Sequence, residues 1–134
     1  MYAPRMTVTY VIEGSGVTGL DSFWDVMGEA VNGPGGYFGR SLDAFADCLG
    51  GGFGTPEDGA FVIEWRDHAR SARALGHEET ARRLEGLLLR AHPTNRARIE
   101  RELAEARAGR GPTLFDDLVG IITDRAGPRA LRLV

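Results

Sequence analysis

The spacing of apolar residues along the chain predicts an alternation of strands and helices. Runs rich in β-branched and aromatic residues, bounded by turn-forming residues, are typical of short strands. These runs are residues 6–12, 60–65 and 130–134. Segments with apolar residues three and four positions apart predict helices instead. These segments are residues 20–31, the second half of 37–49, 67–75, 77–91, 95–108 and 112–124.

Strands separated by helices predict parallel pairing, because a crossover helix returns the chain to the same end of the sheet. We therefore expect an α/β fold in which a small three-stranded parallel sheet is flanked by helices. A chain of 134 residues has the usual size of one domain built around one core. We expect a single domain over residues 1–134.

Composition limits the cellular compartment and the kinds of partner that we expect for the protein. The sequence has no apolar run long enough to cross a membrane, and its N-terminus lacks the pattern of a signal peptide. With one cysteine a disulfide framework is excluded, so we expect a cytoplasmic protein without a membrane partner. The net charge of −3 is uneven: residues 1–80 hold 12 acidic and 5 basic side chains, whereas residues 81–134 hold 7 and 11.

The acidic half contains a compact pair of carboxylates in the segment YFGRSLDAFADCL, residues 37–49. Asp43 and Asp47 are four residues apart, which places them about 40° apart on one face of a helix. Apolar residues fall on the opposite face, and we expect Tyr37 and Phe38 at the mouth of the acidic front. Such a front suits a positively charged partner, although a solvated acidic helix face is the commoner explanation of two such carboxylates.

The sequence gives weaker support for nucleotide binding, metal binding or catalysis. Gly14, Gly16 and Gly19 match the GxGxxG pattern of nucleotide-binding loops, but no second strand with a terminal acidic residue follows. The histidines are scattered and no CxxC pair exists, so we expect no metal and no cofactor. Nothing places a substrate pocket beside the two aspartates, so we expect a protein that is not an enzyme.

The arginine-rich segment 82–110 raises the question of RNA binding. Its arginines alternate with glutamates, as on a salt-bridged solvent surface rather than in a groove for phosphates. We therefore expect no nucleic-acid partner. The segment could still bind a protein, and this leaves open a binding module whose partner contacts the arginines instead of the acidic helix.

The segment YFGRSLDAFADCL resembles the barstar family of intracellular ribonuclease inhibitors. The family pattern has an aromatic pair, a glycine, a polar-Leu-Asp-Ala helix start and then Asp-Cys-Leu. Further similarity lies in YVIEG near the N-terminus, in FVIEWRD at residues 61–67 and in the serine-containing HARSARALG that follows. The resemblance covers residues 8–76 and, more loosely, 113–134. It implies a three-stranded parallel sheet flanked by helices, which agrees with the apolar spacing.

The resemblance also implies a function, namely blocking a bacterial secreted or toxin-type ribonuclease with the acidic helix and its preceding loop. In the family, carboxylates take the place of RNA phosphate and meet basic side chains of the enzyme. Asp47 matches the principal anchor, Asp43 its partner carboxylate and Tyr37 a stacking aromatic. The full set of expected partner-binding residues is Tyr37, Phe38, Gly39, Ser41, Asp43, Ala46, Asp47 and Phe53.

Several positions depart from the family pattern. Ser41 stands where asparagine is common, Ala46 replaces a tryptophan, and Phe53 stands for another interface tryptophan. These changes imply a basic, guanyl-specific type of microbial ribonuclease other than barnase. A barstar-fold module with a non-ribonuclease partner is the alternative, and in either case we expect a monomer when the protein is free.

The length of the chain is a further departure. Residues 77–111 are interpreted as an inserted helical extension before the last helix. Because of it the family's distal glutamate has no clear counterpart: Asp124 is a candidate if 113–125 is the matching helix, and Arg90 has the wrong charge.

Overall fold

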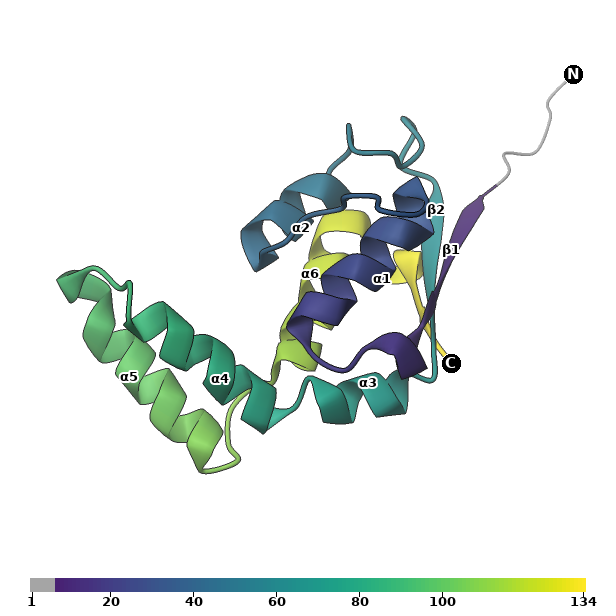
Figure 1. Ribbon diagram of the computed structural model, residues 1–134. Coiled ribbons are helices and arrows are strands. Elements are labelled where there is room, and N and C mark those ends of the chain that lie inside the picture. The colour runs from purple at the N-terminus through teal and green to yellow at the C-terminus, as the bar shows by residue number, and fades with distance from the viewer. Residues whose placement is uncertain (1–6) are drawn as a thin grey trace, which may run out of the picture.

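The computed structural model describes residues 7–134 and contains a parallel sheet with the strand order β1-β2-β3 (Figure 1). Its strands are β1 (Val8–Glu13), β2 (Phe61–Arg66) and β3 (Leu131–Leu133). In the register, Ile12 pairs with Trp65 and Trp65 with Leu133. The α/β fold with three parallel strands is therefore confirmed.

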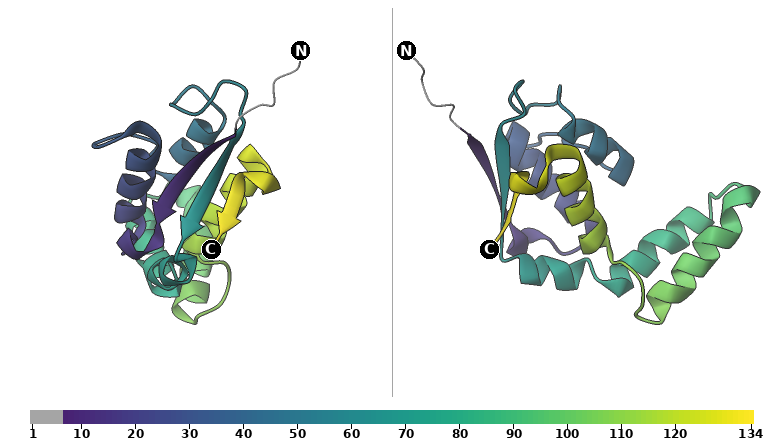
Figure 2. Two further views of the ribbon diagram at one scale, coloured as in Figure 1. Left: turned by 90° about the vertical axis from the view of Figure 1, so that its right-hand side faces the viewer. Right: turned by 180° about the vertical axis from the view of Figure 1, so that it is seen from behind.

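Six α-helices and two short 3-10 turns connect these strands. The helices are α1 (Leu20–Asn32), α2 (Leu42–Leu49), α3 (His68–Ala74), α4 (His77–Leu88), α5 (Pro93–Arg107) and α6 (Leu114–Ala126). The turns are η1 (Gly14–Gly16) and η2 (Pro128–Ala130). Helices α1, α2 and α6 lie on one side of the sheet, whose other face looks toward the viewer in the left panel of Figure 2.

All three predicted strands and all six predicted helices are present, with ends that differ by up to three residues. Helix α6 starts at Leu114 because the Thr113 side chain accepts a hydrogen bond from the Asp116 N–H, and the Asp116 carboxylate accepts one from the Thr113 N–H. This capping box fixes the first turn. Met6, the predicted start of the first strand, lies outside the described residues.

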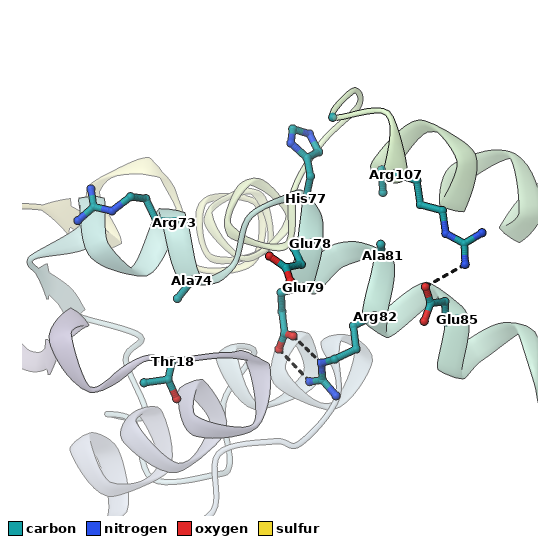
Figure 3. Close-up of a pocket in the computed structure, with 12 residues that line it drawn as sticks. Thr18, Arg73, Ala74, His77, Glu78, Glu79, Ala81, Arg82, Glu85 and Arg107 are labelled. Atoms are coloured by element: carbon teal, nitrogen blue, oxygen red, sulfur yellow. Dashed lines mark hydrogen bonds and ion pairs between the residues drawn. The ribbon is translucent and has the colours of Figure 1, made fainter.

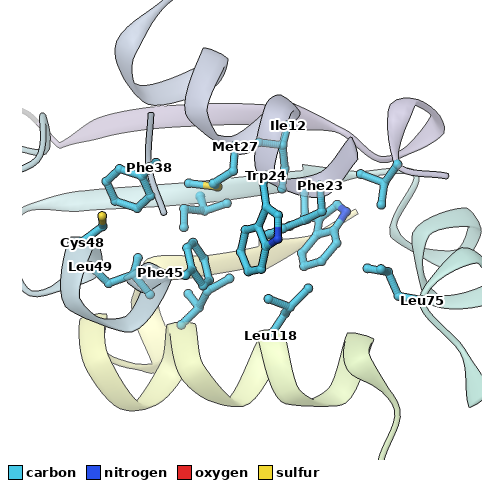
Figure 4. Packing of buried hydrophobic residues seen from close by; sticks show 14 of the residues in the cluster. Ile12, Phe23, Trp24, Met27, Phe38, Phe45, Cys48, Leu49, Leu75 and Leu118 are labelled. Carbon is cyan, nitrogen blue, oxygen red and sulfur yellow. The ribbon is translucent and has the colours of Figure 1, made fainter. Parts of the chain in front are cut away.

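The main core fills the space between the sheet and helices α1, α2 and α6 (Figure 4). It is built around aromatic rings that meet edge to face or at a tilt. The Phe23 ring centroid lies 5.6 Å from that of Phe45 and 5.2 Å from that of Trp65. The Trp65 indole N–H donates to Ser71 Oγ at 2.9 Å, so its polar atom is satisfied inside the core.

Helices α4 and α5 form a hairpin that projects away from the sheet (Figures 1 and 2). The hairpin has a small core of its own, made of aliphatic side chains. Its buried residues are Ala81, Leu84, Ile99, Leu103 and Ala106. The predicted helical extension at residues 77–111 thus corresponds to a hairpin between α3 and α6, with an apolar stripe on each of its helices.

A candidate protein-binding site on helix α2

The acidic helix α2 is amphipathic and firmly capped. The Ser41 side chain accepts a hydrogen bond from the Ala44 N–H at 3.1 Å, which satisfies a free donor of the first turn. The back of the helix buries Phe45, Cys48 and Leu49. Asp43 and Asp47 are exposed on the front, so the helix presents two carboxylates from a fixed backbone.

Cys48 belongs to the packed side of this helix. It is buried, and burial raises the pKa of its thiol, with a further increase from the negative charge of Asp47. A raised pKa keeps the sulfur protonated and poorly nucleophilic. Cys48 therefore acts as a small apolar side chain of the core.

Gly39 brings the preceding loop against α2. Its φ of +90° favours glycine, and a Cβ here would lie 2.6 Å from the Phe45 nitrogen and 2.8 Å from its Cα. Any side chain would push the loop away from the helix. Gly39 itself is buried, so what it contributes to the site is the close backbone approach that sets the position of Tyr37.

The two aromatic residues before Gly39 point in different directions. The Tyr37 side chain is 51% exposed, whereas Phe38 is 1% exposed and its ring centroid lies 6.0 Å from that of Phe45. The prediction that Phe38 lies at the mouth of the acidic front is therefore wrong. Its ring is an anchor for the loop in the core.

Phe53 provides a second exposed aromatic ring, on the loop that follows α2. It is 45% exposed. Ala46, where the family has a tryptophan, is half-buried on the helix. The expected contact residues Tyr37, Ser41, Asp43, Asp47 and Phe53 are thus exposed, and they flank or lie on one short helix.

Asn32, which the sequence did not single out, joins the two loops beside α2. Its side-chain amide donates to the Tyr37 carbonyl and to the Phe53 carbonyl, each at 2.8 Å. In the sequence, the position of Asn32 before a glycine-rich segment predicts only that the helix ends in a turn. The two acceptors lie 5 and 21 residues further along the chain, and no local pattern pairs them.

One cation lies close to the acidic front. The Arg125 Nη2 in the last turn of α6 is 3.8 Å from the Asp47 Oδ1, and both side chains are more than half exposed. At this distance the pair is an ion pair without a hydrogen bond. Exposed pairs of this kind contribute about 0–1 kcal/mol, so Asp47 stays available to a stronger partner.

The nucleotide-binding hypothesis fails at the start of α1. Gly14 is buried, and its carbonyl accepts a hydrogen bond from Ser71 Oγ at 3.0 Å. The N-terminus of α1 is occupied by the Glu79 carboxylate, which accepts from the Leu20 N–H at 2.7 Å. A pyrophosphate would need that same helix end, and a carboxylate already fills it.

A cavity lies away from α2, at the base of the hairpin (Figure 3). It measures about 810 Å³, and its charged lining is largely paired. Arg82 binds Glu79 at 2.6 and 2.9 Å, and Arg107 binds Glu85 at 2.9 Å. The Arg82 hydrogen bond lowers the pKa of Glu79, assisted by the Leu20 N–H. Four of the charged side chains that line this hollow are therefore engaged in ion pairs.

Two further properties bear on the sequence predictions. Within residues 7–134, no helix combines the length and apolar character needed to span a bilayer. The same residues contain no group of three or more histidine, cysteine or acidic side chains arranged to hold a metal ion.

Comparison with known proteins gives one family. The model described as Barstar (barnase inhibitor) matches residues 7–111, which is more than half of the chain. The match includes the α4–α5 hairpin and ends before α6, whereas the resemblance seen in the sequence passed over the hairpin and continued into residues 113–134. No curated protein and no solved structure shows a significant match.

Proposed function

The chain belongs to the barstar family, and on that premise we propose that it inhibits a secreted or toxin-type microbial ribonuclease. Helix α2 and the loop before it enter the active site of the enzyme and block access of RNA. The protein acts in the cytoplasm of a bacterial producer, as an immunity protein or antitoxin, and needs no cofactor and no catalysis of its own.

The single observation that carries this proposal is the pair of exposed carboxylates on a rigidly held helix. Asp43 and Asp47 are exposed on α2, while the back of the same helix is buried in the main core. A ribonuclease must hold phosphates with cationic side chains, and a carboxylate accepts the same charge-assisted hydrogen bonds. Because the helix is held in place before binding, little ordering is needed on association.

The proposed contact surface combines these carboxylates with the exposed residues around them. It consists of Tyr37, Ser41, Asp43, Ala46, Asp47 and Phe53, and the buried Gly39 sets the position of Tyr37. Phe38 supports the surface from inside the core. Ala46 and Ser41 are smaller than the family's residues at those positions, which supports a partner other than barnase. The proposed partner is a basic, guanyl-specific type of microbial ribonuclease. The free inhibitor is a monomer.

The test is titration calorimetry of the protein against basic microbial ribonucleases, including one encoded beside it, with an RNA-cleavage assay in parallel. We expect a one-to-one complex, weakened by salt, in which Asp47→Ala lowers affinity about 30-fold to several thousand-fold. This corresponds to about 2–5 kcal/mol for one partner of a buried interfacial charge pair, a general range that barnase–barstar itself helped to define.

The matched control is Glu102→Ala on α5. Glu102 is exposed and pairs with Arg98 at 3.2 Å, as Asp47 pairs with Arg125. Both variants change the charge by one unit and remove one exposed ion pair, on α2 in one case and on the hairpin in the other. If no ribonuclease binds at low salt, the inhibitor function is rejected. Loss of binding on substitution of hairpin arginines would instead support the alternative module with a different partner.

A further inference from the structure

Helix α1 ends in a residue that connects both loops of the proposed contact surface. Asn32 Nδ2 donates one hydrogen bond to the Tyr37 carbonyl and one to the Phe53 carbonyl, both at 2.8 Å. A primary amide carries two N–H donors on one nitrogen. Both donors are therefore used, and each fixes the backbone of a residue whose aromatic side chain is about half exposed.

The surroundings of Asn32 hold its amide in this orientation. Gly33 ends α1 with φ +79°, and the Gly36 N–H donates to the Gly33 carbonyl at 2.8 Å, which closes a tight turn toward Tyr37. On the other side, Gly54 packs so closely that a Cβ there would lie 2.9 Å from Asn32 Cγ and 3.0 Å from Nδ2. The amide thus sits between two loop backbones that leave it little room.

We propose that Asn32 is a positioning residue for the inhibitor surface, and that its amide clamps together the loop that precedes α2 and the loop that follows it. This inference rests on the proposed function for its effect on binding, while its structural part stands alone. The partner meets Tyr37 and Phe53 at a spacing fixed before association, so it does not have to order either loop.

The first experiment compares Asn32→Asp with Asn95→Asp in binding to a cognate ribonuclease. Both variants add one negative charge; Asn95 lies on the hairpin and is exposed. At position 32 the carboxylate loses both donors and faces two carbonyl oxygens. We expect about tenfold weaker binding from loss of loop ordering, although added negative charge alone would speed association with a basic enzyme. Unchanged or tighter binding of Asn32→Asp would overturn the proposal.

A second pair of variants leaves Asn32 itself unchanged and alters the space that its amide occupies. Gly54→Ala forces a methyl group against Asn32, whereas Gly51→Ala adds one in open space. The two glycines have φ of +118° and +114°, so the backbone strain of each substitution is closely matched. We expect Gly54→Ala to weaken binding more than Gly51→Ala, and equal effects would count against the clamp.

A third measurement needs no partner. NMR relaxation of the free protein reports the order of loops 33–41 and 50–60, and we expect both loops to lose order together in Asn32→Ala. The thermal transition should stay close to wild type, because Asn32 is exposed and outside the core. Loss of order in neither loop would overturn the clamp. Absence of any ribonuclease binding by the wild type would reject the proposed function and leave this result valid.

Discussion

Several charged side chains of the α4–α5 hairpin form ion pairs with one another, whereas helix α2 leaves its two carboxylates largely to solvent. On the hairpin, Arg110 binds Glu105 at 2.8 Å and lowers the pKa of that carboxyl. Arg98–Glu102, Arg107–Glu85 and Arg82–Glu79 are further ion pairs on the hairpin. On α2, by contrast, Asp47 has one loose pair at 3.8 Å.

The difference shows why a count of charges does not identify a binding surface. A surface whose cations and anions are already paired must break those pairs to bind a charged partner. An exposed carboxylate on a capped helix keeps most of its hydration in the folded protein, and on α2 it has at most a loose ion pair to break. It can therefore form a charge-assisted hydrogen bond on association. The acidic front thus presents carboxylates that are largely unpaired, although the hairpin carries more charges.

The two surfaces also lie over different hydrophobic cores, and the largest expected effect is a loss of stability when the main core is emptied. Phe45→Ala removes a fully buried ring that meets Phe23, Trp24 and Phe38. Emptying such a site costs about 3–5 kcal/mol. We expect the free energy of unfolding, followed by tryptophan fluorescence in urea, to fall by that amount, because both tryptophans lie in the main core.

The hairpin counterpart of that variant is Leu103→Ala. Leu103 is 5% exposed and packs in the separate hairpin core. We expect it to lower the helical signal in circular dichroism while leaving the tryptophan transition nearly unchanged. If both variants shifted the tryptophan transition equally, the two cores would have to be treated as one cooperative unit.

Sequence spacing predicted the elements well because each depends mainly on its own residues. The narrow apolar stripe of Ile99, Leu103 and Ala106 identified α5, and the turn-flanked apolar run at 60–65 identified β2. The exposed acidic face of α2 followed from helical geometry in the same way. Periodicity within one element needs no knowledge of the rest of the chain.

The parts of the site that were missed depend on contacts between distant segments. Phe38 was misplaced because an irregular loop has no period that says which ring turns inward. Asn32 bridges to Phe53 across 21 positions, and Glu79 caps α1 across 59 positions. Arg125 reaches Asp47 because α6 packs beside α2. Such contacts arise only when the sheet has placed its helices.

Glu79 lies where the hairpin meets α1, and its substitution should lower stability by an intermediate amount. Its carboxylate caps α1, and replacing a cap costs about 1 kcal/mol. The folded pKa of Glu79 is lowered, first by the Arg82 hydrogen bond. The associated stability is therefore present above the ordinary pKa near 4.5 and is lost as the pH falls through the folded value.

The measurement is urea denaturation of wild type and Glu79→Gln between pH 7 and pH 3. We expect Glu79→Gln to be less stable by about 1 kcal/mol at neutral pH and to approach wild type as the solution is acidified. Glu78→Gln, the exposed neighbour on α4, is the control with no cap to lose. A constant difference between wild type and Glu79→Gln at all pH values would contradict the assignment.

The smallest expected effect concerns Arg125, a cation beside the acidic front. Arg125→Gln removes a positive charge 3.8 Å from Asp47, so the local potential that attracts a basic enzyme becomes more negative. Arg107→Gln makes the same change of net charge on the hairpin, at an ion pair of similar exposure. Stopped-flow association with a cognate ribonuclease at low salt should be about two- to threefold faster for Arg125→Gln, since an exposed pair of this kind is worth up to about 1 kcal/mol.

Arg107→Gln should change the rate less, because its charge lies on the projecting hairpin and is screened over that distance. Equal acceleration by both variants would mean that net charge, rather than the front on α2, steers the encounter.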